Sequence, residues 1–133
     1  MIHRFDLRVY YEDTDLAGIV YYANYLKFIE RARSTVVREA GVDQNAMKDD
    51  LGVIFAVRRV EADYFSSAKL DDELQVQSTV QQISGVRVVF DQKVFRGDDL
   101  LFSALVTVAC AGLNGKPARL PAEIRQKLEK FGL

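Results

Sequence analysis

The stretch VYYEDTDLAGIVYYANYLKFIERAR, residues Val9–Arg33, joins a predicted strand to a predicted long helix and decides the fold. Over 5–11, apolar residues alternate with mostly charged ones, which is typical of a strand with one buried face. Over 25–40, apolar residues recur every three or four positions, which predicts a helix of about four or five turns. We expect this helix to begin near Ala23 or Asn24, after a loop rich in acids.

The rest of the chain predicts four more strands and two short helices. Segments rich in Val, Ile, Phe, Tyr and Thr alternate with turn-forming residues, and their short connections favour an antiparallel, meander-like order. The strands are expected over Ile54–Tyr64, Glu73–Ile83, Val86–Arg96 and Leu100–Ala111, and the helices over 43–52 and from Pro121 onward. The predicted fold class is therefore α+β, with a five-stranded antiparallel sheet wrapped around the long helix.

Length and composition set further limits. A chain of 133 residues fits a single domain over 1–133, and 18 basic residues against 19 acidic ones argue against nucleic-acid binding. No secretory signal opens the chain and no apolar segment approaches membrane-spanning length, so the cytoplasm is the expected location. The single cysteine, Cys110, lies in an apolar run and is expected in the core.

A single helix is too narrow to cover one face of a five-stranded sheet. The segment Leu101–Val108 would form a long apolar edge if it were left unpaired. We therefore expect a partner subunit, and a homo-oligomer, to complete the structure.

The acid-containing loop is the candidate site. Asp15 and Gly18 precede a helix start, whose unpaired N–H groups and partial positive charge suit a developing oxyanion. A carboxylate turned back toward such donors suffices to hydrolyse an activated acyl group. From the residues alone, a capping or solvated turn is favoured over a catalytic one, because Asp and Gly are common in turns.

The neighbouring ionisable residues suggest no metal site. Glu12 and Asp13 are expected to be solvated, and no His or calcium-loop spacing accompanies them, so we predict that no metal binds. His3 is the only histidine and is expected to be exposed on an edge strand. An ordinary Ser-His-Asp triad is then excluded unless this one residue reaches the site.

Three segments together carry a family resemblance. They are D-x-x-G-x-V-Y-x-x-x-Y-x-x-x-x-E-x-A-R over 15–33, VRRVEADYFSSAKLDDEL over 57–74 and LPAEIRQKLEKF over 120–131. The chain resembles the hotdog-fold acyl-CoA thioesterases of the 4-hydroxybenzoyl-CoA thioesterase class, and most closely the bacterial subgroup associated with the Tol-Pal envelope system. The resemblance implies hydrolysis of acyl-CoA without a cofactor, in a dimer or tetramer whose active sites lie at the dimer interface.

The resemblance also implies roles for particular residues. Asp15 matches the active-site aspartate, which acts as nucleophile or as base for water, and Gly18 matches the turn glycine close to the substrate. Tyr22 matches the position whose backbone N–H polarises the thioester carbonyl, and Tyr25 falls where the acyl pocket is lined. Many relatives in the Tol-Pal-associated subgroup carry His at the position of Tyr22. That departure leaves the backbone role in place but weakens any proton-transfer role of the side chain.

Two arginines are candidates for binding the substrate. Arg58 falls among the even, mostly apolar positions of the strand Ile54–Tyr64, which should face the helix. It either pairs with Glu30 as a structural cation or holds a CoA phosphate at the site mouth. Arg87 follows the Ser84-Gly85 turn and either contacts the nucleotide of CoA or is a solvated hairpin charge.

Two other functions stay open. A hotdog-fold dehydratase is disfavoured because its chemistry uses a catalytic His, and none lies near the helix. A non-catalytic module that binds acyl carrier protein or lipid-synthesis enzymes is disfavoured by the intact Asp15 and Gly18. Both CoA and acyl carrier protein remain open as the thiol carrier.

Overall fold

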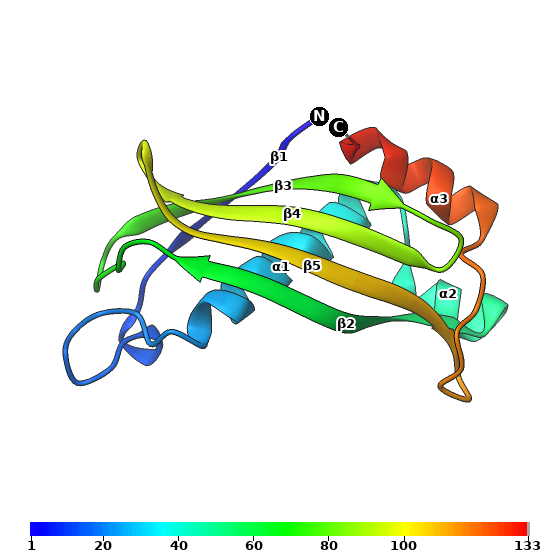
Figure 1. Ribbon diagram of the computed structural model, residues 1–133, viewed down its shortest axis with the longest axis horizontal. Coiled ribbons are helices and arrows are strands. Elements are labelled where there is room, and N and C mark those ends of the chain that lie inside the picture. The colour runs from blue at the N-terminus through cyan, green and yellow to red at the C-terminus, as the bar shows by residue number, and fades with distance from the viewer. Residues whose placement is uncertain (133) are drawn as a thin grey trace.

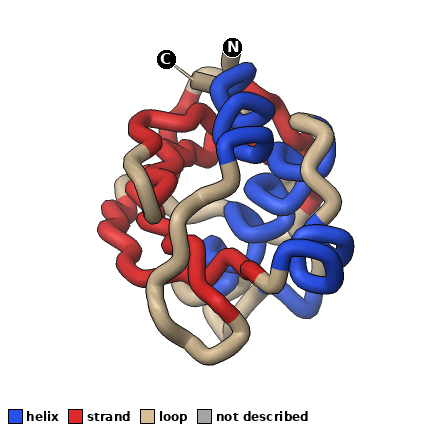
Figure 2. The backbone as a smooth tube through the Cα atoms, turned by 90° about the vertical axis from the view of Figure 1, so that its right-hand side faces the viewer, coloured by secondary structure: helices blue, strands red, loops and turns tan. Residues whose placement is uncertain are grey.

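The α1 helix lies against one side of a curved antiparallel sheet (Figure 1), and Figure 2 shows the helices gathered mainly on that side of the strands. The computed structural model describes residues 1–132. In chain order the elements are β1 (His3–Arg8), η1 (Tyr11–Asp13), α1 (Asn24–Glu39), α2 (Gln44–Leu51), β2 (Val53–Tyr64), β3 (Glu73–Ile83), β4 (Arg87–Arg96), β5 (Asp99–Gly112), α3 (Ala122–Leu128) and η2 (Glu129–Phe131). This is the α+β arrangement that the residue patterns predict and the hotdog fold that the family resemblance implies.

The buried face of α1 is the face predicted from the apolar spacing. Its buried apolar side chains are Tyr25, Phe28, Ile29, Ala32, Val36 and Val37. They belong to one core with the inward side chains of β3, β4 and β5. Burial of each large apolar side chain contributes about 1.5–3 kcal/mol, so this helix organises the core.

The ends of the elements lie close to their predicted positions, except at the first strand. The α1 helix ends at Glu39, and Gly41 follows with a φ of 94°, a conformation that suits glycine at a helix end. The β1 strand already ends at Arg8, and Tyr11–Asp13 form a 3-10 turn instead of continuing it. In the part of the chain that the structure describes, no helix is long and apolar enough to cross a membrane.

The order of the strands corrects the predicted meander. The sheet runs β1-β3-β4-β5-β2, so β2 pairs with β5 and the segment Leu101–Val108 is paired on both sides. The chain leaves β2 at Tyr64 and crosses to the far part of the sheet through residues 65–72, named here the crossover loop. Three strand spacings are about 14 Å, and eight extended residues reach roughly 26 Å. The crossover loop is therefore long enough to span the distance between β2 and β3, and these consecutive strands need not be neighbours in the sheet.

A bulge in β2 changes which residues face the helix. Val57 pairs with Val108 and Arg59 with Thr107, so Arg58 is the extra residue and is exposed. The prediction that all even positions of this strand face the helix is wrong on the N-terminal side of the bulge, where the odd-numbered residues face inward. The predicted burial of Arg58 is also wrong, because a bulge leaves its extra residue outside the ladder.

Cys110 was predicted to be buried and His3 to be exposed, and only the first prediction is confirmed. Cys110 is 1% exposed and lies in the core, as predicted. His3 is on an edge strand as expected but is only 8% exposed. Its ring lies edge-on to Phe131 at 5.5 Å, and its Nε2 atom contacts the carboxylate of Glu39. The C-terminal helical segment and the end of α1 therefore cover this edge.

Asp72 anchors the crossover loop. Its carboxylate accepts hydrogen bonds from the Lys69 N–H at 2.8 Å and from the Arg96 guanidinium at 2.9 Å. Partial burial acts to raise the pKa of Asp72, but these hydrogen bonds and the charge of Arg96 outweigh it and hold the pKa below its usual value. The ionised carboxylate thus stabilises the loop.

Replacing Asp72 with Asn should lower the free energy of unfolding by about 1–2 kcal/mol near neutral pH, because hydrogen bonds to charged groups contribute about 1.5–3 kcal/mol and Asn keeps one acceptor. The lowered pKa makes this contribution present above about pH 4 and lost as the pH falls through the folded-state pKa. Urea unfolding at several pH values checks it. The exposed turn variant Asp98→Asn is the control, and an equal gap between wild type and Asp72→Asn at pH 7 and pH 3 would contradict this assignment.

Candidate active site

The loop that carries Asp15 is held against the crossover loop. Thr14 and Val20 pair as an isolated bridge, and Ile19 pairs in the same way with Lys69. The Val20 N–H donates to the Ala68 carbonyl oxygen at 2.9 Å. Backbone bonds therefore place the loop between β1 and α1 beside the residues that follow β2.

Asp15 opens a tight turn within this loop. The Gly18 N–H donates to the Asp15 carbonyl oxygen at 3.0 Å, and Gly18 has a φ of 80°, which a glycine adopts without strain. The Oδ1 atom of Asp15 accepts the Ala17 N–H at 2.9 Å. This bond orients the exposed carboxylate, and its Oδ2 atom has no partner among the described residues.

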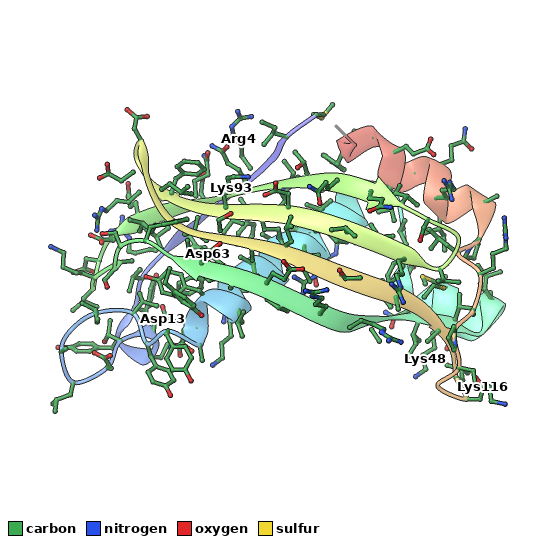
Figure 3. The ribbon with its side chains drawn as sticks, in the orientation of Figure 1. Arg4, Asp13, Lys48, Asp63, Lys93 and Lys116 are labelled. Atoms are coloured by element: carbon green, nitrogen blue, oxygen red, sulfur yellow. The ribbon has the colours of Figure 1, made fainter. Side chains whose placement is uncertain are left out.

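Asp13 is a structural acid, which corrects its predicted exposure. It is 6% exposed, and its Oδ2 atom accepts the Tyr10 N–H at 2.8 Å. Its carbonyl oxygen accepts the Tyr21 N–H and the Asn24 side-chain amide, each at 2.9 Å. Figure 3 labels Asp13 in the loop ahead of α1. Asp13 thus ties the end of the first strand to the start of α1, while Glu12 is exposed as predicted.

The start of α1 leaves two amide donors unpaired. Ala23 occupies the N-cap position, and no side chain caps the helix there. Among residues 1–132, neither the Tyr22 N–H nor the Ala23 N–H has an acceptor, whereas the Asn24 N–H donates to the Tyr21 carbonyl oxygen at 2.8 Å. Such free donors, at the positive end of a helix, stabilise negative charge on a nearby oxygen.

One pocket brings the loop and the helix start together. It has a volume of about 350 Å³, and its lining residues are Asp15, Ile19, Val20, Tyr21, Tyr22, Tyr25, Tyr64, Phe65, Ser66 and Ser67. The predicted residues Asp15, Tyr22 and Tyr25 therefore share one cavity. Gly18 is not in the lining but closes the turn that presents Asp15.

Tyr25 lies in the inner wall of this pocket. It is 2% exposed, stacks on Phe102 with ring centroids 5.1 Å apart, and accepts the Ala68 N–H on its hydroxyl oxygen at 3.0 Å. Burial raises the pKa of Tyr25. Its hydroxyl is therefore committed to fixing the crossover loop.

Sequence reasoning missed one wall of the pocket. Tyr64 ends β2, and Phe65, Ser66 and Ser67 begin the crossover loop. They lie about fifty residues from Asp15 in the chain, and a meander would have carried them away from α1. The available signal is the run VRRVEADYFSSAKLDDEL, which predicts a turn after the strand and carries part of the family resemblance.

The structure does not bring the two predicted arginines to this pocket. Arg58 is exposed at the bulge in the middle of β2. Arg87 pairs with Ala109, whereas Tyr64 pairs with Phe102. Seven residues of β5 separate these positions, which is roughly 24 Å at about 3.4 Å per residue. Arg87 therefore lies at the opposite end of the sheet from the Asp15 pocket.

The arginine that lies partly buried between the helix and the sheet is Arg33 of α1, and not Arg58 of β2. Its guanidinium donates to the Oε1 atom of Gln92 at 3.0 Å, and burial lowers the pKa of Arg33. Gln92 is fully buried and donates in turn to the Ile29 carbonyl oxygen and to the Ser78 hydroxyl, each at 2.9 Å. Glu30, the predicted partner of Arg58, instead accepts a bond from the Ser34 hydroxyl. This polar network is structural.

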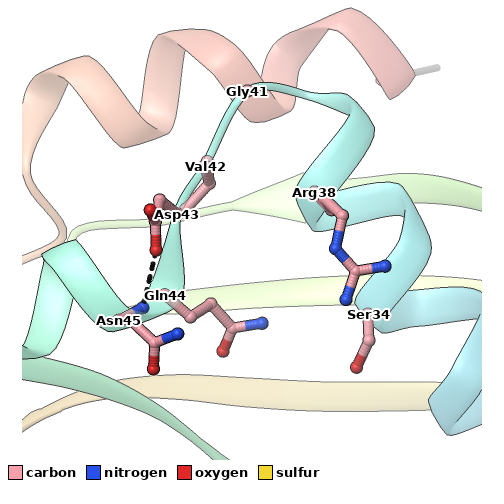
Figure 4. A pocket seen from close by; sticks show the side chains of 7 residues that line it. All are labelled: Ser34, Arg38, Gly41, Val42, Asp43, Gln44 and Asn45. Atoms are coloured by element: carbon pink, nitrogen blue, oxygen red, sulfur yellow. Dashed lines mark hydrogen bonds between the residues drawn. The ribbon is translucent and has the colours of Figure 1, made fainter.

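A second hollow, of about 460 Å³, lies where α1 gives way to α2 (Figure 4). Its one carboxylate belongs to Asp43, whose Oδ1 atom accepts the Asn45 and Ala46 N–H groups at 2.9 and 3.1 Å. This carboxylate is used to cap α2. The hollow therefore lacks the combination of a free carboxylate oxygen and free amide donors that the Asp15 pocket has.

Comparison with known proteins agrees with this fold. Residues 17–103 match the family model described as Thioesterase superfamily, a span that begins two residues after Asp15. The chain is 40% identical over 122 residues to "Acyl-CoA thioesterase YbgC" of Haemophilus influenzae, covering 91% of this chain and 90% of that protein. It is 39% identical over 125 residues to "Acyl-CoA thioester hydrolase YbgC" of Escherichia coli O157:H7, covering 92% of each.

A solved structure, of a probable thioesterase from Bartonella henselae, is also similar. It superposes with a TM-score of 0.86 at 34% identity, covering 91% of this chain and all of that one. The fold and the sequence together define a hotdog-fold thioester hydrolase. The chain belongs to the Thioesterase superfamily, whose model matches more than half of its length.

Replacing Tyr25 with Phe should lower the free energy of unfolding by about 1–3 kcal/mol, because the buried Ala68 N–H loses its acceptor. Thermal and urea unfolding measure the change. The exposed residue Tyr11 supplies the matched control, since Tyr11→Phe removes a hydroxyl that faces water. Equal stability of the two variants would show that the Tyr25 hydroxyl does not hold the crossover loop.

Proposed function

We propose that the chain hydrolyses an acyl-CoA thioester to a free carboxylic acid and CoA. The observation that carries the proposal is the pocket of about 350 Å³, because it is lined by the Asp15 carboxylate and by Tyr22 at the start of α1, where amide donors are free. Relatives at 39–40% identity that are named acyl-CoA thioesterase or thioester hydrolase support the substrate class. A CoA ester also fits the cytoplasmic location predicted from the sequence.

In the proposed reaction the Tyr22 N–H donates to the carbonyl oxygen of the thioester. The oxygen gains negative charge as the acyl carbon becomes tetrahedral, and one such donor is worth about 3–4 kcal/mol of barrier. The positive end of α1 adds to this stabilisation. Collapse of the tetrahedral centre breaks the carbon–sulfur bond, and the CoA thiolate leaves and takes up a proton.

Asp15 supplies the attack in one of two ways. As a base, it removes a proton from water, and the resulting hydroxide adds to the acyl carbon. As a nucleophile, its carboxylate oxygen adds to the acyl carbon and forms a mixed anhydride, which water then hydrolyses. Neither route uses a cofactor or a metal. In both, the tight turn at Gly18 lets the backbone approach the substrate, and the Tyr25 ring bounds the acyl group.

We further propose that the active form is a homo-oligomer, a dimer or tetramer with sites at its dimer interface. The observation behind this is the open edge of β2, where Val57 and Val60 face the helix side of the sheet yet remain 52% and 40% exposed. An unpaired strand of 12 residues with exposed apolar side chains favours pairing with a second chain. Participation in the Tol-Pal system remains a prediction from the resemblance.

Replacing Asp15 with Asn should lower kcat/KM by at least about 10²-fold, since Asn can neither accept the proton of water nor attack the acyl carbon effectively. A panel of aliphatic and aromatic acyl-CoAs, assayed by release of free thiol, checks this. Glu12→Gln is the matched control, because Glu12 is an exposed acid of the same loop and does not line the pocket. Cleavage of no thioester by the wild type would overturn the function, and a variant with most of the rate would overturn the role of Asp15.

Light scattering at micromolar concentration should give a mass of at least twice the 15.1 kDa of one chain. Replacing Val57 with Lys should shift the protein toward monomer, because a charge would be buried where the β2 edge meets its partner. Leu113→Lys changes an exposed leucine in the turn after β5 and should leave the mass unchanged. A monomeric wild type would refute the shared-site proposal.

A further inference from the structure

Tyr64 joins the edge of the sheet to the start of α1. It is the last residue of β2, and its hydroxyl donates to the Tyr22 carbonyl oxygen at 2.9 Å. Its ring lies 4.9 Å from Phe102, 5.6 Å from Tyr25 and 6.2 Å from Tyr22, measured between ring centroids. The ring is thus held by packing that does not depend on the hydroxyl.

The Tyr22 carbonyl lies outside the hydrogen-bond ladder of α1. The Leu26 N–H, its helical partner by spacing, donates instead to the Ala23 carbonyl oxygen at 3.2 Å. Among the described residues, Tyr64 is therefore the one donor to the Tyr22 carbonyl oxygen. Breaking this bond would leave the carbonyl without a protein partner.

The peptide that Tyr64 holds contains one of the two free amide donors, the Ala23 N–H, and adjoins the other, the Tyr22 N–H. The neighbouring positions are fixed separately, because the Tyr21 N–H donates to the Asp13 carbonyl oxygen at 2.9 Å and the Asn24 N–H to the Tyr21 carbonyl oxygen at 2.8 Å. A planar peptide turns as one unit, so a bond to the Tyr22 carbonyl oxygen also sets the direction of the Ala23 N–H. Through the shared Cα atom of Tyr22, it restricts the Tyr22 N–H as well.

We propose that the Tyr64 hydroxyl is a positioning residue for thioester cleavage: it orients the Tyr22–Ala23 peptide so that the amide donors at the helix start face the acyl oxygen. This inference rests on the proposed function. The donated bond also polarises the peptide, since hydrogen bonds in a chain strengthen one another. Burial first, and then the neighbouring Tyr22 and Tyr25, raise the pKa of Tyr64, so the hydroxyl keeps its proton in the neutral range.

A purely structural role makes a different prediction. If Tyr64 only fastened β2 to α1, loss of its hydroxyl would lower the melting temperature and leave the rate constant of the folded enzyme unchanged. If it positions the donors, the loss lowers kcat and leaves KM nearly unchanged, because the affected bond strengthens only as charge develops on the acyl oxygen. The two roles are therefore separable by kinetics.

The test is Tyr64→Phe, which keeps the ring and removes the hydroxyl. We expect kcat for the best acyl-CoA of the panel to fall about tenfold, less than the roughly 10²–10³-fold seen when a whole oxyanion donor is removed. KM should change by less than about twofold, since a hydrogen bond to the neutral carbonyl of the bound substrate contributes little compared with the same bond to the developing oxyanion. Tyr11→Phe, at an 84% exposed residue outside the pocket, should leave both constants unchanged.

A spectroscopic measurement reports the positioning directly. In the ketone analogue of the best substrate, a methylene group replaces sulfur, and the infrared frequency of its bound carbonyl reports polarisation by the amide donors. The shift to lower frequency on binding should be smaller in Tyr64→Phe than in wild type and in Tyr11→Phe. Circular dichroism of each variant shows that it is folded.

The outcomes separate the two proposals. If the wild type cleaves thioesters and Tyr64→Phe retains kcat and the infrared shift, the positioning role of Tyr64 is wrong and the proposed function stands. An increase in KM alone would also overturn it, because that result assigns Tyr64 to substrate binding. If the wild type cleaves no member of the panel, the proposed function fails and this inference fails with it.

Discussion

Burial of α1 against the sheet is the constraint on which the rest of the structure depends. Polar groups that are buried between this helix and the strands must find hydrogen-bond partners there. Gln92 does this from β4, because it is fully buried, bonds the Ile29 carbonyl oxygen and accepts from Arg33. An unmade hydrogen bond at such a place costs about 1–3 kcal/mol. The position and rotation of α1 are therefore narrowly set, and with them the position of its first turn.

The candidate site is a consequence of that placement and of one loop. The crossover loop must pass from β2 to β3 across the end of the sheet where α1 begins. In doing so it accepts a hydrogen bond from Val20 of the Asp15 loop and donates one to the Tyr25 hydroxyl of α1. The pocket is thus built where three segments distant in sequence converge. Its carboxylate and amide donors are presented by backbone turns and not by long side chains, which keeps them rigid.

Three of the wrong predictions concern the burial of a single polar residue. His3 is buried because Glu39 and Phe131, both distant in the chain, lie against its ring, and the Asp13 carboxylate is buried because it accepts the Tyr10 N–H within its turn. Arg58 is exposed because a bulge displaces it. Apolar spacing was sufficient for α1 and for most strand bounds, since burial repeats with the period of each element. No such period tells where a single polar side chain finds its partner.

Local physics in the sequence determined the elements, the fold class, the Asp15-Gly18 turn and the helix that follows it, because alternation, helical spacing and turn residues act over a few positions. The match to relatives over most of the chain identified the family. Only the tertiary structure decided that β2 lies beside β5, that Tyr64 and the crossover loop complete the pocket, and that Arg87 lies at the far end of the sheet. These facts depend on the order of the strands. That order is set by how the whole sheet packs over α1, and no short stretch of sequence encodes this packing.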